Sequence, residues 1–216
     1  MSLEAKICGI NSPDALEAAV DGGARYVGFV FYAPSPRFIT PEQAVMIAAP
    51  APADVKKVGL FVDAEDGAIQ ATLDACPLDM LQFHGAESPE RVMEAKKTFG
   101  LPVIKAIKLA GPDDLFRAGD YLGSADMLLF DAKPPDDLEG ALPGGNALAF
   151  DWELLSGAQW PCPWLLSGGL NTDNLAEAVE ITGTGMVDVS SGVEDTPGHK
   201  DPARITAFLE TVAKIG

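Results

Sequence analysis

The stretch WLLSGGLNTDNLAEAVEITGTGMVDVSSG, residues 164–192, contains the pattern that decides the fold. It begins with a short apolar run, continues through a helical run after Asn171, and ends in a second apolar run at 186–192. A strand, a helix and a second strand in this order form a parallel pair joined by a right-handed crossover. Because the pattern recurs along the chain, the stretch is one unit of a larger parallel sheet.

Eight short apolar or β-branched runs predict eight strands, and helical runs lie between most of them. Four helices have clear start signals, because Ser12, Thr40, Ser88 and Asn171 can accept hydrogen bonds from the free amides of a first turn. Eight such units that close on themselves form a (β/α)8, or TIM, barrel. The predicted strands are residues 5–10, 26–31, 55–62, 80–85, 102–109, 126–132, 164–169 and 186–192, and the other helices are predicted at 64–76, 112–122 and 201–215.

The loop-rich region 133–163 contains one short predicted helix at 150–157. Because no linker or shift in composition divides the 216 residues, we expect a single barrel domain over 1–216. A doubly wound open sheet is the alternative for alternating strands and helices. It is disfavoured because no Gly-rich dinucleotide fingerprint follows the first predicted strand.

The chain is strongly acidic, since 32 Asp and Glu residues against 15 Lys and Arg residues give a net charge of −17. Such a chain repels a nucleic-acid backbone and an anionic membrane surface, so we expect neither as a partner. The expected partner is an anionic small molecule. It has to be held by backbone N–H groups and a few placed cations, because the overall field opposes it.

The three cysteines are Cys8, Cys76 and Cys162, and they show no CxxC or Cys/His ligand spacing. This pattern predicts neither disulfides nor a metal site and favours a reducing, cytoplasmic location. The absence of a long apolar run and of signal-peptide features agrees with that expectation. We interpret Cys76 and Cys162 as packing residues.

Polar side chains interrupt the apolar strands near their C-terminal ends, where TIM-barrel active sites form. Burying such groups without partners costs about 1–3 kcal/mol each, so their convergence favours a site. A satisfied hydrogen-bond network inside the barrel is the alternative. The residues are Lys6, Cys8, Gln82, His84, Asp131, Asp188 and Ser190.

Two loops favour phosphate binding, because they follow the seventh and eighth predicted strands, where this fold frequently holds phosphate. Glycines let the backbone approach an anion, hydroxyl groups donate to it, and the first loop leads into the helix predicted near Asn171. The candidate phosphate-binding residues are Gly168, Gly169, Ser190, Ser191 and Gly192.

Arg37 is the only cation in the loop after the second predicted strand. It is either a solvated loop residue or a guanidinium that binds a substrate carboxylate in bidentate fashion. His84 either binds substrate or satisfies a hydrogen bond in the core, and we expect Gln82 and Asp188 to join it in binding substrate. His199 is predicted to be an exposed loop residue.

Several of these residues belong to motifs that keep the order and spacing of a known family from Lys6 to Asp201. The combination of KICG with SPR, LQxHG and DVSSGVE is highly specific, and the chain closely resembles the phosphoribosylanthranilate isomerases of tryptophan biosynthesis. The motifs are KICGI (6–10), GFVFYAPSPR (28–37), LQFHG (81–85), LLFDA (128–132), GGNALAFDW (144–152), LLSGGLN (165–171) and DVSSGVEDTPGHKD (188–201).

The resemblance implies a cofactor-free barrel enzyme that converts N-(5-phosphoribosyl)anthranilate to 1-(2-carboxyphenylamino)-1-deoxyribulose 5-phosphate. It matches Cys8 to the general base, Asp131 to the general acid and Arg37 to the arginine that binds the anthranilate carboxylate. The SGG and SSG loops match its phosphate loops. We expect Cys8 to work as a thiolate and a desolvated Asp131 to keep its proton. Monomer and homodimer both stay open.

The chain departs from the family in the loop after the sixth strand. Relatives often read GG(S/T)GK there, whereas residues 144–148 read GGNAL, so a glycine and a cation are missing. Two rival functions stay open as well. One is the histidine-pathway aldose isomerase, whose two catalytic aspartates the cysteine at position 8 disfavours. The other is a non-catalytic phosphate-binding barrel, which has no use for Cys8 and Asp131 together.

Overall fold

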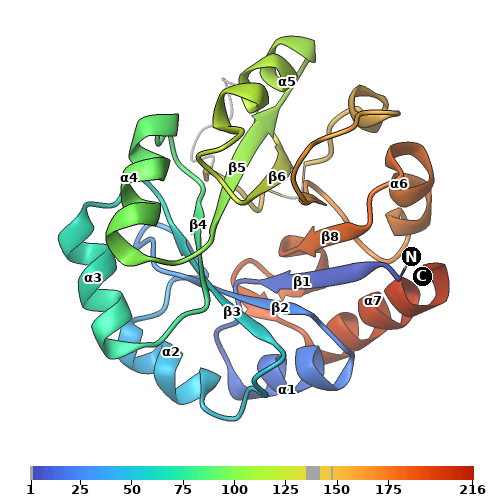
Figure 1. Cartoon of the computed structure of the whole chain (residues 1–216). Coiled ribbons are helices and arrows are strands. Elements are labelled where there is room, and N and C mark those ends of the chain that lie inside the picture. Colours follow the sequence, from blue (N-terminus) through green and yellow to red (C-terminus); the bar gives the residue numbers. More distant parts are fainter. Residues whose placement is uncertain (1, 135–141, 147) are drawn as a thin grey trace.

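The computed structural model describes residues 2–134, 142–146 and 148–216. Eight parallel strands close into a barrel in the order of the chain, and the helices form a ring around it (Figure 1). The predicted TIM barrel is therefore confirmed. The strands are β1 (Glu4–Cys8), β2 (Tyr26–Val30), β3 (Lys56–Phe61), β4 (Met80–Phe83), β5 (Val103–Leu109), β6 (Met127–Ala132), β7 (Trp164–Leu166) and β8 (Met186–Val189).

Three of the four helices with predicted capping residues begin where those residues predict. Ser12 and Ser88 each accept a hydrogen bond from the amide three residues on, and Thr40 forms a reciprocal capping box with Gln43. The helices are α1 (Pro13–Asp21), α2 (Pro41–Ala48), α3 (Asp66–Ala75), α4 (Pro89–Phe99), α5 (Pro112–Ala118), α6 (Leu175–Thr182) and α7 (Pro202–Ile215). Short 3₁₀ turns lie at Gly119–Tyr121, Trp152–Leu155 and Ser191–Val193.

The helix predicted after Asn171 begins at Leu175 instead. The Asn171 side chain accepts from the amides of Asp173 and Asn174, at 2.8 and 3.2 Å, and this local turn delays the helix. The seventh and eighth strands also end earlier than predicted. Gly168, at φ +87°, turns the chain away after β7, and a 3₁₀ turn follows β8.

The segment after β8 forms a small antiparallel hairpin that the sequence does not predict. Its strands are β9 (Glu194–Thr196) and β10 (His199–Lys200). His199 is exposed, as predicted, but it lies in β10 rather than in a loop. The hairpin places Glu194 and Lys200 side by side, both buried, which matters for the site below.

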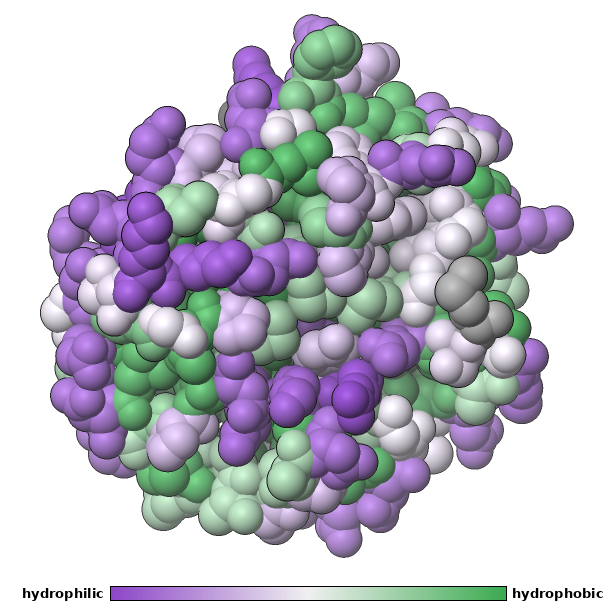
Figure 2. All heavy atoms as spheres, in the orientation of Figure 1, coloured by the Kyte–Doolittle hydropathy of each residue, from purple (hydrophilic) through white to green (hydrophobic). Residues whose placement is uncertain are grey.

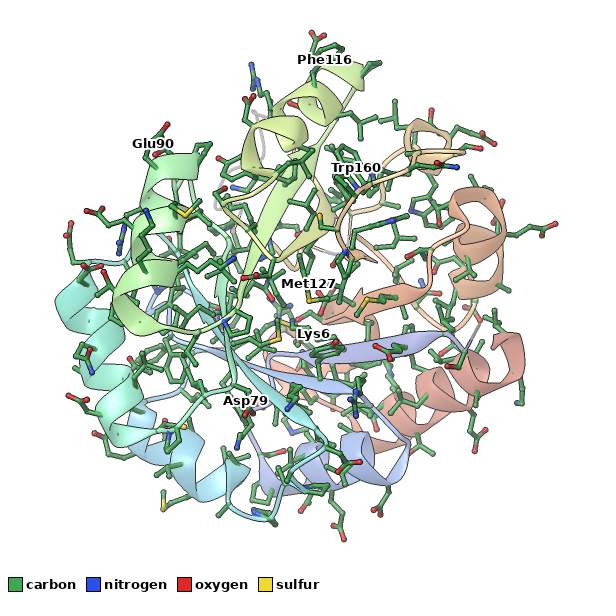
Figure 3. All side chains as sticks on the ribbon, in the orientation of Figure 1. Lys6, Asp79, Glu90, Phe116, Met127 and Trp160 are labelled. Carbon is green, nitrogen blue, oxygen red and sulfur yellow. The ribbon has the colours of Figure 1, made fainter. Side chains whose placement is uncertain are left out.

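Apolar side chains fill the space on both sides of the barrel wall. Strand residues such as Ile7 and Phe29 pack outward against the helices, while Met127 and its neighbours fill the lower interior. Figure 3 shows Met127 and Lys6 near the barrel centre, with Glu90 and Phe116 at the periphery. The interior residues are Val58, Met80, Ile104, Ala106, Met127, Leu129 and Leu165.

Hydrophilic side chains gather along the outer edge of the molecule, over α3 and α4, on the face drawn in Figure 2. Such a surface agrees with the large excess of acidic residues. Within the described ranges, no helix is long and apolar enough to cross a membrane.

Candidate active site

A pocket of about 720 Å³, the open solvent at its mouth included, lies at the C-terminal ends of the strands. Polar residues from six strand ends converge on it. The predicted site residues that line it are Cys8, Arg37, His84, Asp131, Gly168, Gly169, Asp188, Ser190 and Ser191. Gln82 and Gly192 are not part of this lining.

Cys8 lies at the end of β1, on the inner face of the barrel. Lys6, two residues earlier in the strand, lies on the same face. The ammonium group of Lys6, which is fully buried, donates to Asp188 Oδ1 at 2.8 Å. Asp188 Oδ2 accepts from the Ser167 hydroxyl at 3.1 Å. A satisfied network, one of the two alternatives for these residues, therefore exists beneath the pocket, and Cys8 lies at its edge.

Gly28 of β2 leaves the room that Lys6 and Cys8 need. A Cβ atom built on Gly28 would lie 3.0 Å from Cys8 Sγ and 3.1 Å from Lys6 Nζ. Both side chains therefore pack against bare backbone, with the thiol and the ammonium close to each other.

Burial raises the pKa of Cys8 above its ordinary value, and Lys6 opposes that effect as the nearest cation. Burial alone would lower the pKa of Lys6, but Asp188 and Cys8 hold it above its usual range. The resting protein therefore holds Cys8 as a thiol and Lys6 as an ammonium at neutral pH. The thiolate that we expect to act as base has to form in the presence of substrate.

We expect the Cys8 thiolate to appear only above the ordinary pKa of 9.0 when the pH of the substrate-free protein is raised. The sign follows from burial, which disfavours the charged form of a thiol. Thiolate absorbance near 240 nm measures this, as the difference between the wild type and Cys8→Ser so that Cys76 and Cys162 cancel. A difference signal with a midpoint below pH 8 would contradict the described burial.

Asp131, near the end of β6, contacts His84, which directly follows β4. His84 Nε2 lies 3.1 Å from Asp131 Oδ2, and Gln82 Nε2 lies 3.0 Å from His84 Nδ1. His84 therefore links Gln82 to Asp131, and the tautomer of its ring sets which atom donates in each contact. Asp131 Oδ1 also accepts from the Ala132 amide at 2.9 Å. Together these hydrogen bonds fix the plane of the Asp131 carboxyl group at the pocket wall.

The loop after β6 packs directly on these groups. A Cβ atom on Gly144 would lie 2.6 Å from His84 Nε2 and 2.7 Å from Asp131 Oδ2, so only glycine fits there. Asn146 binds the backbone of Leu142 through both side-chain atoms, at 2.8 and 3.0 Å. In this chain Asn146, at the Ser/Thr position of the relatives' motif, therefore closes the loop, and Leu148 stands where relatives often have a cation. Ala147 lies outside the described residues.

Arg37 is buried rather than solvated. Its Nε and Nη2 atoms donate to Glu194 Oε1 and Oε2, at 2.6 and 2.8 Å, and Nη2 also donates to the Gly145 carbonyl at 3.1 Å. Lys200 donates to the same Glu194 carboxylate. Nη1 has no hydrogen-bond partner among residues 2–134, 142–146 and 148–216. The guanidinium therefore lines the pocket with one fixed edge and one available edge.

These contacts keep Glu194 ionised. Burial would raise the pKa of Glu194, but the hydrogen bond from Arg37 and the charge of Lys200 hold it below its usual value. Burial lowers the pKa of Lys200, and Glu194 opposes that change.

The two loops predicted to bind phosphate lie next to each other at the pocket. Gly168 and Gly169 both have positive φ, at +87° and +66°, and a Cβ atom on either would come within 2.8 Å of neighbouring backbone. Their amides have no acceptor in the described part of the chain, so they are available to an anion. Gly192 packs against the Leu170 carbonyl, where a Cβ atom would lie 2.0 Å away. Gly192 does not line the pocket, and its part in phosphate binding stays a prediction.

The candidate residues taken from the sequence omit Glu194 and Lys200, which the structure places next to Arg37. Lys6 is among the polar strand residues there, but it has no assigned role, and the structure places it next to Cys8 and Asp188. Strand alternation does place Lys6 on the face of Cys8, so that signal was present. Glu194 and Lys200 follow β8 in an irregular segment, and only the hairpin brings them back to Arg37.

Comparison with known proteins gives consistent matches over the whole chain. The profile of the family described as N-(5'phosphoribosyl)anthranilate (PRA) isomerase matches residues 5–211. An N-(5'-phosphoribosyl)anthranilate isomerase of Rhodospirillum centenum is 56% identical over 215 residues, which cover 100% of each chain.

Solved structures agree with the sequence matches. A phosphoribosyl anthranilate isomerase from Thermotoga maritima has a TM-score of 0.86 at 35% identity, covering 97% of this chain and 98% of its own. A phosphoribosyl anthranilate isomerase in complex with reduced 1-(o-carboxyphenylamino)-1-deoxyribulose 5-phosphate has a TM-score of 0.82 at 33% identity, with 97% and 98% coverage.

Proposed function

The chain belongs to the N-(5'-phosphoribosyl)anthranilate isomerase family, and we propose that Cys8 and Asp131 carry out the acid–base chemistry of its reaction. The protein is a phosphoribosylanthranilate isomerase of tryptophan biosynthesis, and the reaction is an Amadori rearrangement of an aldose to a ketose. Family membership decides against the two rival functions, the histidine-pathway isomerase and the non-catalytic barrel. One observation carries the proposal: Cys8, Asp131, Arg37 and both phosphate loops line a single pocket.

The first proposed step opens the ribose ring. Asp131 gives a proton to the ring oxygen while the anilino nitrogen forms a double bond to C1, so the C1–O bond breaks and a Schiff base forms. The His84 contact supports this role, because it fixes the direction of the Asp131 carboxyl group. Gly144 packs against both residues on this side of the pocket.

The second proposed step moves the double bond. Cys8 removes the proton from C2, the electrons pass to the C1–N double bond, and an enolamine results, which tautomerises to the ketose. The nearby Lys6 ammonium stabilises the thiolate when it forms. Asp188 and Ser167 hold Lys6 in place for this purpose.

The two charged ends of the substrate fix its direction. In the proposal the available Nη1 edge of Arg37 binds the anthranilate carboxylate, and the free amides of Gly168 and Gly169, with Ser190 and Ser191, bind the phosphate. A chain with a net charge of −17 needs such local donors to hold a ligand that carries both a phosphate and a carboxylate.

Replacing Arg37 with alanine is expected to raise KM by about 10- to 100-fold and to change kcat only slightly, because a charged hydrogen-bond pair to the carboxylate is lost. The decrease in substrate fluorescence on turnover measures both constants. Arg91→Ala removes an arginine that pairs with Asp66 on the outside of the barrel and is the matched control. An unchanged KM in Arg37→Ala would sink the carboxylate assignment.

Oligomeric state and location stay predictions. We propose a cytoplasmic enzyme that acts without a cofactor, as a monomer or a homodimer. A Thermotoga maritima relative with a TM-score of 0.81 is described as a monomeric form generated from a dimeric isomerase, which supports leaving both states open. Size-exclusion chromatography with light scattering would decide between them.

A further inference from the structure

The buried cluster of Arg37, Glu194 and Lys200 contains a cation that the proposed chemistry does not use. Lys200 is buried and cannot reach solvent, and its ammonium donates to Glu194 Oε1, to the Ser190 carbonyl at 3.1 Å and to the Ser190 hydroxyl at 3.2 Å. An ammonium group has three protons, so these three acceptors satisfy it completely. Lys200 therefore has no proton left with which to bind substrate.

Lys200 changes the net charge of the cluster formed by Arg37, Glu194 and Lys200. Without Lys200, the two oxygens of Glu194 would face Arg37 alone, and the pair would be neutral. With Lys200, two cations share one carboxylate, so one positive charge remains in the cluster. In the described part of the chain, Arg37 is the member of this cluster that lines the pocket, so that charge lies at its guanidinium. In a low-dielectric setting the remaining charge acts strongly on a nearby anion.

The position of Lys200 supports this role, since it connects the two anion sites. Through Glu194 it reaches Arg37, and through the carbonyl and hydroxyl of Ser190 it reaches the phosphate loop after β8. Gly198 fixes Glu194 from the other side, because its amide donates to Glu194 Oε2 at 3.1 Å. The β9–β10 hairpin thus holds the carboxylate in one orientation.

We propose that Glu194 and Lys200 are positioning residues, which fix Arg37 and leave it with the net positive charge that attracts the substrate carboxylate. The proposal rests on the function assigned to Arg37 above. It assigns the hairpin a part in substrate selection. Ligands with an ortho carboxylate bind more tightly because of the cluster, and ligands without one do not.

The test compares two ligands that differ only in the carboxyl group. One is the reduced form of the product, 1-(2-carboxyphenylamino)-1-deoxyribulose 5-phosphate. The other is the same reduced compound with a phenyl group in place of the 2-carboxyphenyl group. The ratio of their dissociation constants, the carboxylate factor, isolates the contribution of the charge cluster from phosphate binding and from general loss of structure. Titration calorimetry on the full chain measures both constants.

Lys200→Met is expected to reduce the carboxylate factor by about tenfold, because Arg37 is then fully neutralised by Glu194. The double variant Glu194→Gln with Lys200→Met is expected to recover most of that loss, since Arg37 again carries an unpaired charge. Lys96→Met, which removes a lysine from the Asp126 ion pair away from the pocket, changes the net charge equally and is the matched control. Its carboxylate factor should equal that of the wild type.

An unchanged carboxylate factor in Lys200→Met would overturn the proposal. So would a reduced factor that the double variant fails to recover, because only a structural role would then remain. If Lys200→Met does not fold, Lys200→Gln removes the charge and keeps a donor, and the same two outcomes apply. Arg37→Ala separates the two levels of inference: if it leaves the factor unchanged, the assignment of Arg37 itself fails.

Discussion

Replacing Cys8 with serine is expected to lower kcat by about 10⁴-fold and to leave the affinity for the reduced product within about twofold. Serine fills nearly the same volume, so the packing against Gly28 is kept. A hydroxyl is a far weaker acid than a thiol, and even the Lys6 ammonium cannot make it a useful base at neutral pH. Turnover is followed by substrate fluorescence and affinity by calorimetry.

Cys76→Ser is the matched control for this change. Cys76 is also a buried free cysteine, but it lies at the end of α3 and does not line the pocket. We expect Cys76→Ser to keep wild-type turnover at a temperature where it is folded. A Cys8→Ser variant with a rate close to the wild type would remove Cys8 from the mechanism.

Replacing Asp131 with asparagine is expected to lower kcat by about 10³- to 10⁴-fold, because an amide cannot transfer a proton to the ring oxygen. Asparagine keeps the shape of the side chain and an oxygen that can accept from His84 or the Ala132 amide. The fold and the binding of the reduced product should therefore be retained. The same fluorescence and calorimetric measurements separate lost chemistry from lost binding.

Asp126→Asn is the control for Asp131→Asn. Asp126 precedes β6, at the opposite end of the strand, and binds Lys96 and the Val103 amide. Its replacement should affect stability and not kcat. If Asp131→Asn and Asp126→Asn had equal kcat values, a catalytic role for Asp131 could not be maintained.

The barrel could be predicted from the sequence because each level of the pattern agrees with the others. Apolar runs mark all eight strands, and side chains such as Ser12 and Thr40 mark the helix starts. The errors occur where local hydrogen bonds compete with regular structure. At Asn171 a side-chain turn delays α6 to Leu175, and no hydrophobic period could show it.

The candidate site was predictable in part for a different reason. Strand alternation fixes which side chains face the interior, so Cys8 and Asp131 could be placed at the rim from the sequence. It does not say which of these side chains bind each other. Gln82 faces the same interior, yet it supports His84 from below instead of lining the pocket.

The partners of Arg37 could not be derived from the sequence at all. Glu194 is 157 residues away along the chain, and an irregular hairpin brings it back. The direction of the Cys8 pKa is a similar case. The family motif predicts a working thiolate at Cys8, whereas burial, which depends on packing, raises the pKa of the thiol in the substrate-free protein.

The measurement that tests the division of labour most directly is a borodeuteride quench of each variant mixed with substrate. Borodeuteride reduces the Schiff base at C1 and the ketose at C2, so the position of deuterium shows how far the reaction has gone. If Asp131 opens the ring and Cys8 moves the proton, Cys8→Ser gives C1 label above the uncatalysed background and almost no C2 label. Asp131→Asn then gives neither above background. C2 label at the wild-type rate in Cys8→Ser, or C1 label above background in Asp131→Asn, would contradict the account.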